Sequence, residues 1–69
     1  MTRLGRAIQS RREAHKMTLR ALSEAASMSI SYLCEIEAGD AKPSWDVLTK
    51  IATALGIKLS LLIQESERG

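Results

Sequence analysis

The sequence predicts an all-α fold of five short helices. Three observations indicate this class. Apolar residues recur at helical spacing, most clearly between positions 45 and 55, where they share one face: Trp45, Leu48, Ile51, Ala52 and Leu55. A Ser or Thr that can accept hydrogen bonds from free backbone N–H groups precedes three of the helical segments: Thr18, Ser29 and Ser44. Helix-breaking residues fall between segments, where stops and turns are expected: Gly39, Pro43 and Gly56.

The first two helices are expected at residues 2–16 and, after the Thr18 cap, at residues 19–26. Leu4, Ile8, Arg12 and His15 form the inward stripe of the first helix. The buried side of the second helix should be Leu22, Ala25 and Ala26, and residues 27–28 should make a tight turn.

The remaining three helices follow the same logic. The third should run from the Ser29 cap to about Ala38, with Gly39 as the left-handed residue that closes it. The fourth should run from the Ser44 cap to about Leu55, and Gly56 should end it. A short fifth helix is expected at residues 59–64, and residues 64–69 are expected to be a frayed tail.

Size and composition exclude several classes of function. The 69 residues fit a single domain, 1–69, with a small core. The one cysteine, Cys34, excludes an internal disulfide and a cysteine-based metal cluster. The one histidine, His15, has no catalytic-triad pattern around it, so neither an enzyme nor a metal site is expected. No cofactor or small-molecule ligand is indicated. No secretion signal or membrane span is present, so a cytoplasmic location is expected.

The segment 18–39 predicts two short helices joined by a tight turn. On the second of these helices, Leu33, Ile36 and Glu37 fall on one face, and the opposite face is mostly polar: Ile30, Ser31, Cys34 and Glu35. A helix that is buried on one side and presents small polar groups at its N-terminal end can enter a DNA major groove. This arrangement is a helix-turn-helix.

An acid on a buried face needs a partner, because an unpaired buried charge is costly. Arg12 follows Ile8 by one turn on the inward stripe of the first helix, where a core residue belongs. The planar guanidinium suits a carboxylate. The sequence therefore predicts a buried Arg12–Glu37 ion pair; the alternative is that both side chains extend to the surface.

Several residues together resemble the phage repressor/Cro-like (XRE-type) helix-turn-helix family: Arg12, Thr18, Leu22, residues 36–39, Pro43, Ser44 and residues 48–57. The resemblance covers about residues 4–63. It implies a five-helix, lambda-repressor-like DNA-binding domain with the third helix in the major groove. It also implies a buried pair at Arg12 and Glu37 and a homodimer that binds a two-fold operator to regulate transcription.

The candidate DNA contacts divide by task. The positions that match the family's base readers are Ser29, Ile30, Ser31 and Glu35. The candidate phosphate contacts are basic or hydroxyl residues: Arg11, Lys16, Thr18, Arg20, Tyr32, Lys42 and Ser44. Residues 1–20 carry six of the ten basic residues and one acid, which favours contact with phosphates; a solvated helix face is the alternative.

Two further expectations remain open alternatives. A dimer patch is expected at Trp45, Ile57 and Leu61, although Trp45 fits the core equally well. The family usually has Gln at the position of Leu19, and Glu35 would repel phosphates without a cytosine partner. These departures favour a second function, a protein-interaction module of antitoxin or adaptor type on the same fold.

Overall fold

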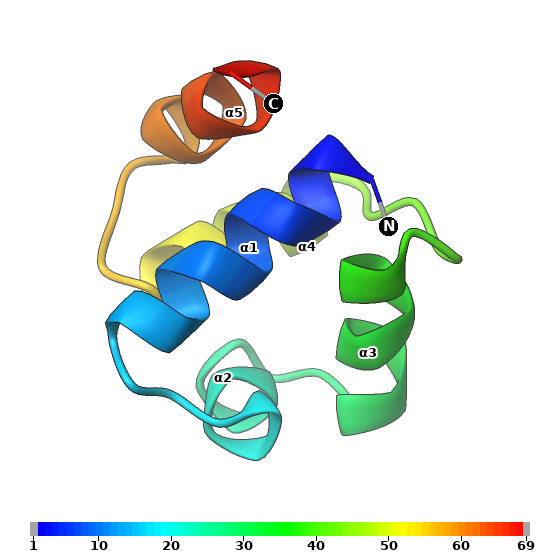
Figure 1. Ribbon diagram of the computed structural model, residues 1–69. Coiled ribbons are helices and arrows are strands. Elements are labelled where there is room, and N and C mark those ends of the chain that lie inside the picture. The colour runs from blue at the N-terminus through cyan, green and yellow to red at the C-terminus, as the bar shows by residue number, and fades with distance from the viewer. Residues whose placement is uncertain (1, 69) are drawn as a thin grey trace.

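The computed structural model describes residues 2–68, which form five α-helices and no strand (Figure 1). The helices are α1 (Arg3–Ala14), α2 (Leu19–Ala25), α3 (Ile30–Ala38), α4 (Trp45–Ala54) and α5 (Leu59–Arg68). Helix α1 packs against α3 and α5, α2 packs against α3 and α4, and α4 packs against α5. In Figure 1, α1 lies in the middle, with α5 on one side and α2 and α3 on the other. The predicted all-α class is confirmed.

Side-chain caps define where the helices begin. Thr18 Oγ1 accepts a hydrogen bond from the Ala21 N–H at 3.0 Å, and the hydroxyls of Ser29 and Ser44 make the equivalent bonds at the starts of α3 and α4. Helix α3 is closed by the cap residue Gly39, whose φ of 87° is left-handed. Since these caps depend on residues only three positions apart, they could be predicted from local sequence.

The core takes its largest buried side chains from all five helices. At most 2% of each of the following residues is exposed: Ile8, Leu22, Leu33, Ile36, Ile51, Leu55 and Leu62. The short helices are stable through this shared packing, because isolated helices of 7–12 residues are marginal in water.

Two inward positions, Ala25 and His15, were predicted wrongly, and for Trp45 the core alternative does not apply. In α2, Ala25 is exposed and Ser23 is buried in its place; the Ser23 hydroxyl donates to the Arg20 carbonyl at 2.8 Å, which satisfies it in the core. His15 is exposed, because α1 ends at Ala14 and the chain turns through Lys16, whose φ is 57°. Trp45, the first residue of α4, is 66% exposed and does not join the core.

Helix α5 continues to Arg68, four residues beyond its predicted end. The Ser66 hydroxyl donates to the Ile63 carbonyl at 2.6 Å, and Glu65 forms an ion pair with Arg11 of α1. The expected frayed tail is therefore helical as far as Arg68, and Gly69 lies outside the described residues. Within residues 2–68, no helix combines the length and apolar character needed to cross a bilayer.

Candidate nucleic-acid interface

Helix α3 is divided into a buried face and an exposed face. Leu33, Ile36 and Glu37 are buried. The side chains on the opposite face are exposed: Ile30, Ser31, Cys34 and Glu35. This is the division that the helical spacing predicts. It leaves one whole side of a capped helix open to a partner.

The turn between α2 and α3 is tight and strained at one residue. Ser27 has a φ of 56°, in the left-handed region that glycine adopts at no steric cost. The Ser27 N–H donates to the Glu24 carbonyl at 3.1 Å, and the Met28 N–H donates to the Ser23 carbonyl at 2.9 Å. These two bonds close the end of α2 and direct the chain into the Ser29 cap of α3.

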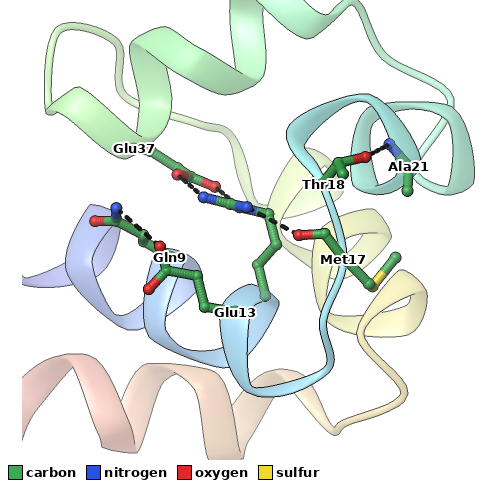
Figure 2. Close-up of polar contacts among 7 residues, drawn as sticks. Gln9, Glu13, Met17, Thr18, Ala21 and Glu37 are labelled. Atoms are coloured by element: carbon green, nitrogen blue, oxygen red, sulfur yellow. Dashed lines mark hydrogen bonds and ion pairs between the residues drawn. The ribbon is translucent and has the colours of Figure 1, made fainter.

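Arg12 and Glu37 form a buried, two-pronged ion pair (Figure 2). The Arg12 Nε donates to Glu37 Oε2 at 2.8 Å, and Nη2 donates to Oε1 at 3.2 Å. Their side chains are 11% and 8% exposed, so the surface alternative does not apply. The hydrogen bonds that Arg12 donates to the Glu37 carboxylate raise the pKa of Arg12 above its usual value. Arg12 therefore keeps its positive charge at neutral pH.

A third bond from Arg12 extends the connection to α2. Its Nη1 donates to the backbone carbonyl of Met17 at 2.9 Å (Figure 2). Met17 directly precedes the Thr18 cap, so one guanidinium joins α1, the entry to α2 and the last turn of α3. The sequence predicts the carboxylate partner but not this carbonyl, because backbone acceptors leave no sign in the residue types.

Gly5 is a positioning residue that the sequence analysis missed. A Cβ at Gly5 would lie 2.9 Å from the carbonyl carbon of Glu37 and 2.9 Å from the carbonyl oxygen of Ile36. Only a residue without a side chain allows α1 to approach the end of α3 this closely. The one available signal was a glycine inside a helical pattern, which commonly has a packing reason.

Six of the seven candidate phosphate contacts lie near the helix-turn-helix, and the seventh, Arg11, lies beside α5. The six lie at the start of α2, on α3, or between α3 and α4: Lys16, Thr18, Arg20, Tyr32, Lys42 and Ser44. All six are exposed except Tyr32, which is partly buried against the core. Arg11 does not belong with them, because its guanidinium is bonded to Glu65 of α5. Arg11 therefore does not join the surface around α3.

The sequence matches a family with this architecture. Residues 3–62 match the family model described as a helix-turn-helix domain. The chain belongs to this helix-turn-helix family. The resemblance to phage repressors is confirmed, because one relative is the immunity repressor protein of Bacillus phage phi105, 39% identical over 62 residues. That match covers 90% of this chain and 43% of the repressor.

Other relatives of the helix-turn-helix domain are also regulators. The transcriptional regulator ClgR of Mycobacterium tuberculosis is 41% identical over 66 residues, which cover 94% of this chain and 59% of ClgR. The chain thus spans about half the length of the curated relatives it matches. These relatives are transcriptional regulators and not enzymes, in agreement with the sequence prediction.

Solved structures show the same fold. The clp gene regulator ClgR from Corynebacterium glutamicum superposes with a TM-score of 0.92 at 35% identity, over 96% of this chain and 70% of that one. The restriction-modification controller protein C.AhdI from Aeromonas hydrophila gives a TM-score of 0.87 at 26% identity, over 88% and 92% of the two chains. The five-helix architecture is therefore shared with gene regulators.

The three candidate dimer residues of the helix-turn-helix domain differ in exposure. Trp45 is 66% exposed and Leu61 is 37% exposed, so both present apolar surface to solvent. Ile57 lies between α4 and α5, is partly buried and packs against the core. Of these three candidates, Trp45 and Leu61 therefore have apolar side chains that a partner could cover.

Proposed function

We propose that this helix-turn-helix domain binds double-stranded DNA sequence-specifically in the cytoplasm and regulates transcription as a homodimer on a two-fold operator. The observation that carries the proposal is the exposed face of α3, whose orientation is fixed by the Arg12–Glu37 pair and the Arg12–Met17 bond. In this proposal α3 lies in the major groove. No cofactor is needed, because binding requires only side chains and backbone N–H groups of the chain.

Base reading is assigned to four residues at and after the start of α3: Ser29, Ile30, Ser31 and Glu35. The Ser31 hydroxyl can donate to or accept from several bases. Ile30, 38% exposed, suits a thymine methyl group, and the Glu35 carboxylate can accept from the amino group of cytosine. Ser29 already accepts the Tyr32 N–H, and its hydroxyl hydrogen remains available to a base.

Phosphate contact is assigned to Lys16, Arg20 and Lys42, with the hydroxyls of Thr18, Tyr32 and Ser44. Thr18 and Ser44 accept backbone N–H groups as caps and keep a hydroxyl hydrogen to donate. Contacts of this kind position the domain on the duplex, and the bases select the site. Because each neutralised phosphate releases counterions, affinity should fall steeply with salt.

Dimerisation is assigned to the exposed side chains of Trp45 and Leu61, with a smaller contribution from Ile57. A single domain offers few base contacts, and joining two copies makes the second contact intramolecular, which raises the overall affinity. Half-sites about one helical turn apart, roughly 34–36 Å, would fit a symmetric pair of recognition helices.

The deciding experiment is selection of bound duplexes from a random pool at about 0.15 M salt, the usual ionic strength for such comparisons. The expected result is enrichment of a two-fold site. A matched pool bound by the Ser31→Ala/Glu35→Gln variant should lose preference at the positions that these side chains read. Enrichment without two-fold symmetry would contradict the homodimer, and retention of all sequences equally would contradict base reading.

A second function is favoured by one specific observation. The exposed face of α3 carries an apolar side chain, Ile30, and a negative one, Glu35, but no cation. Such a face also suits a protein partner, as in an antitoxin-like or adaptor-like module. Failure to retain any duplex even at low salt would favour this alternative, because phosphate contacts are strongest there.

A further inference from the structure

A basic groove lies between α1 and α5. Its volume is about 670 Å³, within the range of small-molecule sites, and its lining includes four arginines and one carboxylate: Arg3, Arg6, Arg11, Arg68 and Glu65. We call this feature the α1–α5 groove. Its formal charge of +3 exceeds the +2 of the whole chain, so positive charge is concentrated there.

The α1–α5 groove is separate from the proposed DNA-binding face. The α1 residues that line it share one side of the helix, and the residues that face the core and α3 share the opposite side: Gly5, Ile8 and Arg12. At 100° per residue, Ser10 and Gly5 point about 140° apart. Figure 1 shows α3 and α5 on opposite sides of α1. The proposed binding of DNA through α3 therefore leaves these arginines unused.

The charges within the groove are not balanced. Glu65 bonds to Arg11 through both of its oxygens. Arg3, Arg6 and Arg68 make no ion pair with any carboxylate of residues 2–68. A symmetric contact with a second copy through this groove would bring arginines of the two copies together, which like-charge repulsion disfavours. The groove thus suits an anion.

We propose that the α1–α5 groove binds an oligophosphate, a compact ligand with several phosphate groups in a row. Arginine presents a planar set of donors that fits phosphate oxygens in pairs. From Arg3 to Arg11 the arginines spread over about 12 Å of helix, so consecutive phosphates can each meet a different one. Inorganic triphosphate and the triphosphate tail of a nucleotide share this chemistry.

Glu65 sets the strength of this site. Among residues 2–68 it is the one carboxylate in the groove lining, and it both repels an anion and occupies Arg11. Removing its charge should therefore strengthen oligophosphate binding. A gain of this kind is informative, because a variant that merely misfolds cannot produce it.

The test is titration of the folded chain with inorganic triphosphate by calorimetry at about 0.15 M salt, where charges more than about 8 Å apart are largely screened. The Arg6→Gln/Arg68→Gln variant removes two exposed groove cations and should lower the affinity at least about tenfold. The matched control, Arg20→Gln/Lys42→Gln, removes two cations from the proposed DNA-binding face and should lower it less than about threefold. Glu65→Gln should raise it.

The ligand's position is checked by amide chemical shifts. Triphosphate should move the signals of Ser10 and Glu65 and leave those of Ser31 and Glu35 in place. Equal losses in the two double variants, shifts confined to α2 and α3, weaker binding by Glu65→Gln, or no saturable binding would each overturn the proposal. The proposal would also be overturned if a DNA duplex of unrelated sequence shifted the amide signals of the groove residues and triphosphate did not. A parallel titration with adenosine triphosphate distinguishes a nucleotide from inorganic oligophosphate as the ligand. Tighter binding of adenosine triphosphate than of inorganic triphosphate would identify the ligand as a nucleotide.

Discussion

Gly5 of α1 meets the backbone of Glu37 so closely that no side chain fits between them. A Cβ built on Gly5 falls 2.9 Å from the carbonyl carbon of Glu37, nearer than real Cβ contacts come. Arg12, two turns further along α1, holds the carboxylate of the same Glu37. Helix α1 therefore fixes both the backbone and the side chain of one residue near the end of α3, and with them the orientation of that helix.

Gly5→Ala should destabilise the domain by about 1–3 kcal/mol, as overpacking typically does. The neighbouring atoms belong to the α3 backbone, which can move only with the helix. The sign of this change in stability is informative, because in an unhindered helix position alanine is favoured over glycine by about 1 kcal/mol and the substitution would stabilise the domain. Chemical denaturation measures the free energy of unfolding. Ser10→Ala, at an exposed position of α1, is the control and should change it little; a stabilised Gly5→Ala variant would contradict the close approach.

Arg12→Ala and Glu37→Ala should each destabilise the domain by about 3–5 kcal/mol, because each leaves the other charge buried and unpaired. The double variant Arg12→Met/Glu37→Leu removes both charges and should lose less than either single variant. Urea denaturation of all three gives the comparison. Single-variant losses below about 1 kcal/mol would indicate a pair that behaves as if it were exposed.

Ser27→Gly should stabilise the domain by up to about 1 kcal/mol, because glycine adopts the left-handed conformation without the steric cost of a Cβ. The same replacement inside a helix should destabilise the domain. Ser10→Gly, in α1, should cost about 0.5–1 kcal/mol. Thermal unfolding followed by circular dichroism reports both; a destabilised Ser27→Gly variant would mean that the serine contributes more than its conformation costs.

Glu35→Gln should alter base preference at one position of each half-site and leave stability unchanged. The carboxylate accepts from the cytosine amino group, whereas an amide both donates and accepts and suits adenine. Binding to a panel of single-base operator variants measures the preference. The control is Glu67→Gln, which removes the same charge from an exposed residue of α5 instead of α3. Identical preferences in the two variants would remove Glu35 from the base readers.

Trp45→Ser should weaken self-association, because it removes the most exposed large apolar side chain of the described residues. Its effect on stability should be small, since the side chain is 66% exposed and outside the core. Sedimentation equilibrium gives the dimer dissociation constant, and thermal unfolding checks the fold. Trp45→Phe, which keeps an apolar ring, should retain most of the association. An unchanged dissociation constant for Trp45→Ser would place the dimer contact elsewhere.

The helix starts and the division of α3 into two faces were predictable because they depend on residues within one or two turns. The Ser29 cap needs only Tyr32, and the buried face needs only the spacing of Leu33, Ile36 and Glu37. The Arg12–Glu37 pair was predictable for a related reason, since each charge interrupts an otherwise apolar stripe. In such cases local pattern and tertiary structure agree.

The features that were missed depend on contacts between distant segments. The polar residues at the end of the chain did not indicate that α5 continues to Arg68. Glu65 of this segment pairs with Arg11, which lies 54 residues earlier in the sequence. The same pairing removes Arg11 from the expected phosphate contacts. The close approach at Gly5 was missed and the exposure of Trp45 was left open, because both depend on how the helices are placed, which residue spacing alone does not specify.

The exposed face of α3 separates what the domain needs for folding from what it needs for selectivity. The side chains of Ile30, Ser31 and Glu35 are exposed, and the hydroxyl of Ser31 and the carboxylate of Glu35 make no hydrogen bond with the rest of residues 2–68. Substitutions at exposed sites of this kind usually change stability by less than about 0.5 kcal/mol. These positions can therefore change by single mutations while the core stays the same. One scaffold can thus acquire many base preferences, by evolution or by design.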